Sequence, residues 1–148
     1  MISLDTDWVE AFDGTKLCVQ SVGIGPPFVL ANGLGGSIKA WRPLIEHFAD
    51  QYRFVSWDYR GLYRSVPAVD RHAVRIVDHA RDLHTVIEAQ GLKDPIIAGW
   101  SMGVQVMFEY ALTFDGTSPE HALQLLFEHP DFDSHLEVQT TTPIQASG

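Results

Sequence analysis

The sequence predicts an α/β fold in which a mostly parallel sheet is flanked by helices. Short runs that are continuously apolar, such as residues 28–31 and 95–98, are typical of strands buried on both faces, as parallel sheets require. Segments with apolar residues at helical spacing lie between these runs. Because the connections are short and strands alternate with helices, we expect right-handed βαβ units.

The N-terminal segment has the pattern of a β-hairpin. Residues 8–12 and 16–22 alternate between apolar and polar side chains, and Asp13-Gly14 between them is a strong turn signal. The lone cysteine, Cys18, lies in the second of these runs. It excludes an internal disulfide, and we expect a plain buried thiol.

The middle of the chain supplies two predicted helices and a strand. Residues 38–49 carry an amphipathic stripe that includes Trp41, and residues 53–57 (RFVSW) form the next apolar run. Residues 71–90 predict a long helix, with Asp70 as a suitable N-cap and Gly91 as a suitable stop.

Three histidines lie on this long helix, but their spacing does not suit a metal site. His79 and His84 are five residues apart rather than four, so they do not share a face as helical zinc ligands would. We therefore expect His72, His79 and His84 to lie on a solvated face, together with their charged neighbours Asp78, Arg81 and Asp82.

The most informative stretch is residues 95–112, PIIAGWSMGVQVMFEYAL. It predicts a buried strand, a sharp turn that carries Ser101, and a buried helix. A side chain at either Gly99 or Gly103 would collide with the neighbouring strand or helix, so the two glycines let the turn present the serine hydroxyl. A purely structural turn is the alternative interpretation.

Two further loops follow predicted strands at what should be the same edge of the sheet. Residues 32–37 (NGLGGS) contain three glycines and follow the strand at 28–31, and residues 58–65 (DYRGLYRS) follow the strand at 53–57. The carboxyl ends of parallel strands form ligand-binding crevices. A flexible loop or a phosphate-binding turn would also explain the glycines, although neither G-x-G-x-x-G nor a P-loop lysine is present.

Together these motifs resemble the α/β-hydrolase superfamily, which includes esterases, cofactor-free haloperoxidases, proline iminopeptidases and C–C bond hydrolases. The resemblance covers roughly residues 7–112 and depends most on the G-x-S-x-G element at 99–103. Asn32 stands where the family's oxyanion loop usually has histidine. Tyr63 replaces the second glycine of its D-x-R-G-x-G-x-S loop and is expected to narrow the mouth of the crevice.

The resemblance implies a serine hydrolase that acts on an ester, amide or related small molecule through an acyl-enzyme. Ser101 would be the nucleophile, and the backbone amides of Leu34 and Met102 would form the oxyanion hole. Trp100 would line an apolar substrate pocket, with core packing as the alternative. No cofactor and no metal is implied.

The C-terminal residues depart from the family pattern, in which an acidic residue and then a histidine follow the serine. Residues 113–148 predict only a short helix at 122–129 and an irregular polar tail. Their candidates for base and acid are of residue types that more often lie on the surface: His121, His129 and His135, with Asp115, Asp131 and Asp133.

We therefore expect residues 1–112 to be the N-terminal half of a hydrolase core that is incomplete at its C-terminal end and weak or inactive alone. A non-catalytic binding or interaction module that retains the crevice is the alternative. The sheet would have an uncovered edge beyond the elbow strand, which favours self-association.

Charge and hydropathy exclude several classes of partner. The net charge of −9 comes with only 10 basic residues, so neither nucleic acid nor an anionic membrane surface is an expected partner. The first residues lack the basic start and apolar stretch of a signal peptide, and no apolar run is long enough to span a bilayer. A cytoplasmic location is the simplest expectation.

Overall fold

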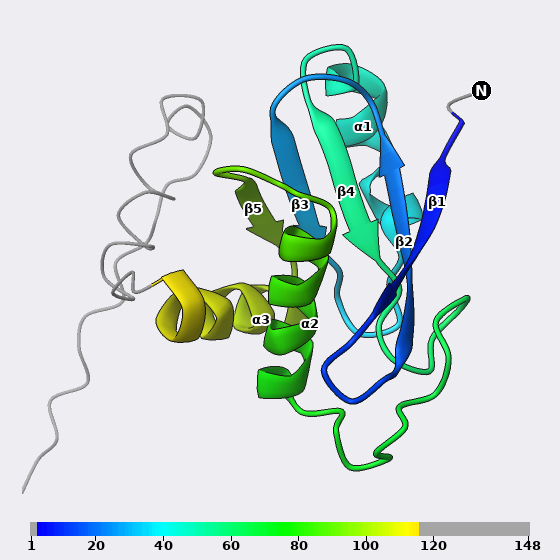
Figure 1. Cartoon of the computed structure of the whole chain (residues 1–148). Coiled ribbons are helices and arrows are strands. Elements are labelled where there is room, and N and C mark those ends of the chain that lie inside the picture. Colours follow the sequence, from blue (N-terminus) through cyan, green and yellow to red (C-terminus); the bar gives the residue numbers. More distant parts are fainter. Residues whose placement is uncertain (1–2, 116–148) are drawn as a thin grey trace, which may run out of the picture.

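A computed structural model of the chain describes residues 3–115. Five strands form one sheet in the order β1-β2-β4-β3-β5: β1 (Asp5–Glu10), β2 (Lys16–Val22), β3 (Pro27–Ala31), β4 (Arg53–Trp57) and β5 (Ile96–Gly99) (Figure 1). β3 pairs in parallel with both β4 and β5, whereas β2 is antiparallel to β1 and β4. The predicted α/β class and N-terminal hairpin are confirmed, and the hairpin makes the sheet mixed. Its first strand spans Asp5–Glu10 rather than the predicted residues 8–12.

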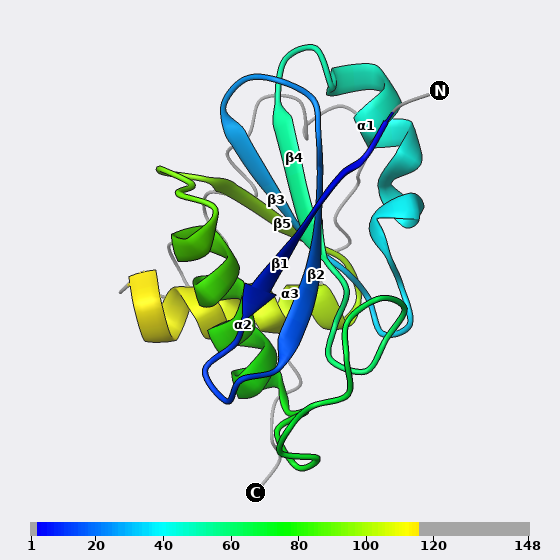
Figure 2. The same ribbon diagram turned by 45° about the vertical axis from the view of Figure 1, so that its right-hand side comes forward.

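Helices cover both faces of this sheet (Figure 2). A 3₁₀ turn, η1 (Ile38–Trp41), leads into α1 (Arg42–Phe48) on one face. On the other face α2 (Ile76–Ala89) packs against α3 (Met102–Tyr110), which continues as a π-helical turn, η2 (Ala111–Asp115). The predicted helix at 38–49 is thus present, but its first turn is 3₁₀.

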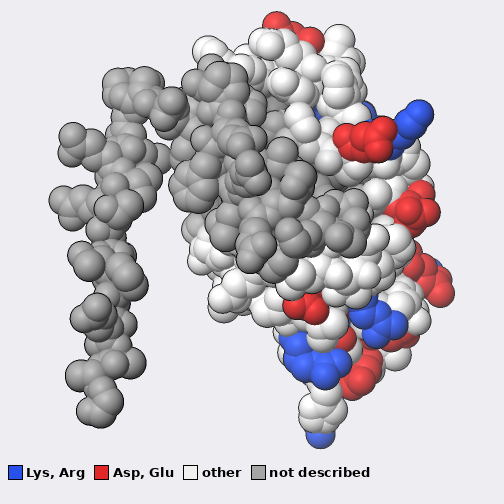
Figure 3. Space-filling model, turned by 90° about the vertical axis from the view of Figure 1, so that its left-hand side faces the viewer, with Lys and Arg blue, Asp and Glu red and all other residues white. Residues whose placement is uncertain are grey.

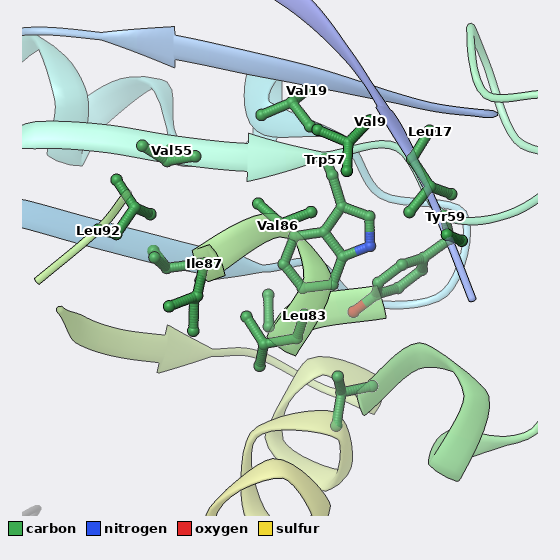
Figure 4. Close-up of a cluster of buried hydrophobic side chains, with 14 residues drawn as sticks. Val9, Leu17, Val19, Val55, Trp57, Tyr59, Leu83, Val86, Ile87 and Leu92 are labelled. Atoms are coloured by element: carbon green, nitrogen blue, oxygen red, sulfur yellow. The ribbon is translucent and has the colours of Figure 1, made fainter. Parts of the chain in front are cut away.

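One hydrophobic cluster lies on each face of the sheet, because successive strand residues point to opposite sides of it. In β3, Val29 and Ala31 belong to the cluster beneath α2 and α3, whereas Leu30 belongs to the cluster beneath α1. Figure 4 shows the larger cluster, in which Trp57 of β4 lies among Val86 and Leu83 of α2. β3 and β4 are therefore largely buried on both faces, as their apolar runs predict. The prediction of a fully buried strand at 95–98 was wrong, because β5 lies at an edge of the described sheet and Ile96 is exposed.

The long predicted helix begins later than its local signals indicate. α2 starts at Ile76, with Arg75 as its N-cap, and the Asp78 carboxylate accepts the Arg75 backbone N–H at 3.0 Å. Asp70 instead accepts the backbone N–H of His72 at 2.9 Å within the preceding loop. The predicted N-cap was therefore wrong, while Gly91 follows the helix with the positive φ of +60° expected of a stop.

The prediction of a solvated histidine face was also wrong for the middle of α2. His79 is only 5 % exposed, and Asp78 and Asp82 are buried as well. These residues pack beneath the loop that follows β4, where Tyr59 and Arg60 cover them. His72 is exposed, as expected, but lies in the loop before α2 rather than on the helix. His84 is half-buried, with its ring stacked on that of Phe114.

Residues 116–148 lie outside the described part of the chain, and with them lie the predicted helix at 122–129 and all three C-terminal histidine candidates. Among residues 3–115 no helix is both long and apolar enough to cross a membrane. On the face shown in Figure 3, acidic and basic side chains lie beside one another along one margin, so its described surface carries no continuous basic patch.

Candidate active site

Ser101 occupies a sharp turn between β5 and α3. Its φ of 53° and ψ of −123° lie outside the conformations that side-chain-bearing residues ordinarily adopt. The two flanking glycines make this turn possible, since a Cβ at Gly103 would lie 2.0 Å from the Ala31 carbonyl oxygen of β3. A Cβ at Gly99 would lie 2.5 Å from the Gly103 backbone. The predicted steric reason for both glycines is confirmed, and Ser101 is exposed.

The same turn directs a helix N-terminus toward the serine. Met102 is the first residue of α3, and the first amides of a helix have no acceptor within it. The helix dipole adds partial positive charge at this end, which favours a nearby anion. The turn is closed by hydrogen bonds from Gly103 N to Trp100 O at 2.9 Å and from Val104 N to Ser101 O at 3.1 Å.

The glycine loop that follows β3 lies against this turn. A hydrogen bond of 2.9 Å from Gly36 N to Gly33 O closes it, and Gly35 has a φ of +72°. A Cβ at Gly33 would lie 2.9 Å from the Trp100 indole, so the loop and the elbow are in direct contact. Leu34, which carries one predicted oxyanion amide, lies at the tip of the loop with its side chain 75 % exposed.

Trp100 fits neither of its two interpretations alone. Its indole covers Gly33 and Gly36, which is a packing role, yet the side chain is 43 % exposed beside Ser101. It therefore lies at the surface next to Ser101 rather than in the core. Its contact with substrate stays a prediction.

The side chain of Asn32 fixes the start of the glycine loop through three hydrogen bonds. Its buried side chain donates to Ser56 Oγ and to the Trp57 carbonyl, both at 3.1 Å, and accepts from Trp41 Nε1 at 2.8 Å. The asparagine thus ties β3 to β4 and to the turn η1. Its backbone carbonyl accepts the Tyr59 hydroxyl at 2.5 Å.

The loop after β4 is held by its first and last residues. Asp58 accepts from Gln20 Nε2 at 3.0 Å and from the Arg64 backbone N–H at 3.2 Å. Ser65 Oγ donates to the Asp58 carbonyl at 2.6 Å and accepts the Cys18 backbone N–H at 2.9 Å. The loop therefore closes on itself against β2.

Tyr63 projects from this loop toward the glycine loop. It has a φ of +47°, its side chain is 64 % exposed, and its hydroxyl donates to the Gly35 carbonyl. The side chain that replaces a glycine of the family motif thus bridges two of the three loops at this edge.

Arg60 is the centre of a buried ion-pair network beneath the site. Its guanidinium binds both carboxylate oxygens of Asp82, at 2.6 and 2.8 Å, and Asp13 in the hairpin turn at 2.7 Å. A fourth contact, of 3.2 Å, reaches the Ala73 carbonyl. Burial favours the neutral forms, yet Arg60 outweighs this for Asp13 and holds the pKa of that carboxyl below its ordinary value. For the more deeply buried Asp82 burial dominates and raises the pKa.

His79 lies next to this network, and the centroids of its ring and of the Tyr59 ring are 4.6 Å apart. Burial, reinforced by the positive charge of Arg60, lowers the pKa of His79 to about 4. The imidazole is therefore neutral at physiological pH. Burial also raises the pKa of Tyr59, whose hydroxyl remains a donor to Asn32.

The family model described as alpha/beta hydrolase fold matches residues 26–146. This chain belongs to the alpha/beta hydrolase family. The match includes the glycine loop, the loop after β4 and the elbow, so the family assignment and the site geometry concern the same residues.

Relatives in this family include hydrolases. The chain is 34 % identical over 90 residues to the candidate carbamate hydrolase RutD of Azorhizobium caulinodans, covering 61 % of this chain and 33 % of the relative. With the RutD of Caulobacter segnis it shares 27 % identity over 124 residues, or 80 % of this chain and 46 % of the relative. The chain thus spans a third to a half of the length of the curated relatives it matches.

Solved structures show the same fold. An esterase from Exiguobacterium antarcticum matches with a TM-score of 0.66 and 27 % identity, covering 72 % of this chain and 40 % of the esterase. An alpha/beta hydrolase from Novosphingobium aromaticivorans matches with a TM-score of 0.70 at 20 % identity, covering 78 % and 41 % of the two chains. The second likeness concerns the fold alone.

Proposed function

We propose that this chain is the nucleophile-bearing part of a serine hydrolase of the α/β-hydrolase family, with residues 1–112 as the core unit. The observation that carries the proposal is the backbone at Ser101. A serine at positive φ, between two glycines that admit no Cβ, is a conformation with a cost of about 1–3 kcal/mol, and such strain gathers at functional sites. An ordinary structural turn would not need it.

In the proposed reaction, Ser101 Oγ attacks the carbonyl carbon of an ester, amide or carbamate. The π electrons of the C=O bond move onto oxygen, and the amides of Leu34 and Met102 stabilise this oxyanion. A histidine C-terminal to the elbow, oriented by a carboxylate, takes the hydroxyl proton and returns it to the leaving group. The C=O bond re-forms as the bond to the leaving group breaks, which leaves the acyl group on Ser101 Oγ. Water then gives a proton to the histidine and attacks the acyl carbon, and the bond to Ser101 Oγ breaks as that oxygen regains the proton, releasing the acid. No metal or cofactor is required by this chemistry.

The carbonyl class is proposed from the relatives, which carry the names of carbamate hydrolases and esterases. Trp100 and the exposed side chains of Leu34 and Tyr63 would give the crevice mouth an apolar rim, which suits a small apolar acyl or alcohol group. The cytoplasmic location remains a prediction from the sequence.

A fluorophosphonate probe tests the proposal directly. We expect slow covalent labelling of the folded chain at Ser101, as suits a chain that is weak alone. Labelling should be lost in Ser101→Ala and after denaturation, but retained in the control Ser3→Ala, which removes an exposed serine near the N-terminus. Only an activated hydroxyl reacts, because an isolated serine is protonated at neutral pH. Absence of labelling in the folded chain would favour the alternative, a non-catalytic interaction module.

We also propose that the chain, when studied by itself, associates with a second copy through β5. Among the described residues β5 pairs on one side only, with β3, and Ile96 on this edge is 46 % exposed. An edge of this kind can template pairing with an identical strand. Analytical ultracentrifugation should show dimers that Ile96→Lys weakens at least tenfold, whereas Ile24→Lys, in the exposed β2–β3 loop, should not. A monomer at all concentrations would refute the proposal.

A further inference from the structure

Two tyrosines from the loop after β4 each hold one carbonyl of the glycine loop. The Tyr59 hydroxyl donates to the Asn32 carbonyl at 2.5 Å, and the Tyr63 hydroxyl donates to the Gly35 carbonyl. Between these two points, the Gly33 carbonyl accepts from Gly36 N at 2.9 Å. Three carbonyls of the loop therefore have fixed donors.

These contacts determine where the Leu34 amide points. In a trans peptide the N–H lies opposite the C=O of the same plane, so holding the Gly33 carbonyl inside the turn directs the Leu34 N–H out of it. The Gly33–Gly36 hydrogen bond is the only one of the three that the loop makes with itself. Its persistence depends on the conformation at Gly35, which a glycine can leave at little cost.

We propose that Tyr63 is a positioning residue whose hydroxyl holds the Gly35 carbonyl and thereby keeps the Leu34 amide aimed for the oxyanion. This inference rests on the proposed function. Tyr59 holds the rigid base of the loop, where Asn32 is already fixed by three side-chain hydrogen bonds. Tyr63 instead holds the other end of the loop, where its hydroxyl donates to the Gly35 carbonyl next to Gly36.

The backbone of Tyr63 supports a role for its side chain. A φ of +47° is unfavourable for tyrosine and free of strain for glycine, so the backbone alone would favour glycine at this position. The side chain is also mostly exposed and contributes little to the core. Its bridge to Gly35 is the contact that offsets the unfavourable backbone.

Amide hydrogen exchange measured by NMR on the 148-residue chain tests the bridge without requiring catalysis. Tyr63→Phe keeps the ring and removes the hydroxyl. We expect the amides of residues 34–36 to exchange about fivefold faster, the effect of losing one hydrogen bond. In urea titrations the unfolding equilibrium constant should rise by no more than about the same factor. The matched control is Tyr52→Phe, which removes a hydroxyl from a tyrosine packed against Phe28 near the start of β4. Equal exchange in wild type and Tyr63→Phe would overturn the inference.

The rate of fluorophosphonate labelling then tests positioning itself. If Tyr63 aims the oxyanion donor, Tyr63→Phe should lower the labelling rate severalfold at saturating probe and leave the half-saturating probe concentration unchanged. Faster exchange with an unchanged labelling rate would overturn the positioning role. A wild-type chain that does not label would refute the proposed function instead, and the exchange rates would still decide whether Tyr63 orders the loop.

Discussion

Acid should destabilise the fold through His79, which is buried between Tyr59 and the Arg60 network. In the folded chain its pKa is lowered from 6.5 to about 4, first by burial and then by the charge of Arg60; Asp78 opposes the shift only in part. The unfolded chain takes up the proton near pH 6.5, whereas the folded chain resists it until about pH 4. The free energy of unfolding is therefore not reduced by His79 above pH 6.5, and it decreases as the pH falls from 6.5 toward 4.

The size of the effect follows from this shift. Each pKa unit corresponds to about 1.4 kcal/mol, so the free energy of unfolding should fall by about 2.5 kcal/mol between pH 7.5 and 4.5 because of His79 alone. The carboxyls of Asp13 and Asp78, whose pKa values lie below the ordinary 3.8, lose their ion pairs at lower pH. Their effect therefore falls largely below this pH range. Asp82, whose pKa burial raises, acts in the opposite direction, because the folded chain takes up its proton at a higher pH than the unfolded chain does.

Urea titrations at a series of pH values should separate His79 from other groups. His79→Phe retains a ring beside Tyr59 and should remove about 2.5 kcal/mol of the pH dependence between pH 7.5 and 4.5. His72→Gln, which replaces an exposed histidine of the preceding loop, is the matched control. If His79→Phe has the same pH profile as the wild type, the buried neutral imidazole is not the cause.

Two further substitutions test the packing beneath the site. Gly103→Ala should cost at least about 4 kcal/mol or prevent folding, because its Cβ would lie 2.0 Å from the Ala31 carbonyl oxygen, whereas Gln105→Ala on the exposed side of α3 should cost under about 0.5 kcal/mol by thermal unfolding. Arg60→Met should cost about 3–5 kcal/mol in urea titrations because it leaves the Asp82 carboxylate buried without its partner. Adding Asp82→Leu should recover part of that loss; no recovery would argue against the desolvation of Asp82 as its cause.

The strands were the most predictable part of the fold. The bounds predicted for residues 16–22 and 53–57 agree with β2 and β4, because each pattern begins at a charged residue and stops before Gly23 or Asp58. The start of α2 was missed because Arg75 is not a usual N-cap residue, and the cap depends on its pairing with Asp78. The buried face of α2 was missed for a different reason. The charged side chains next to His79 in the sequence indicate a helix face exposed to solvent, unless a buried partner of opposite charge is known.

That partner, Arg60, lies 22 residues before Asp82 in the chain, so no local pattern reveals the pairing. The elbow at Ser101 was predictable because its two glycines and flanking apolar runs are all within a few residues of one another. The Tyr63 bridge to Gly35 was not, since it depends on the conformations of two separate loops. Sequence reasoning indicated only that Tyr63 should affect the mouth of the crevice.

The backbone conformation at Ser101 places thermal stability and the presence of a reactive hydroxyl in opposition. Glycine adopts a φ of 53° without penalty, so a Ser101→Gly chain should unfold at a higher temperature than the native one while having no hydroxyl to react. Selection for thermal resistance alone would therefore remove the very oxygen that the proposed reaction needs. In a homologue that is no longer selected for catalysis, we expect glycine to replace serine at this position. Variants selected only for heat tolerance should therefore be sequenced at residue 101 first.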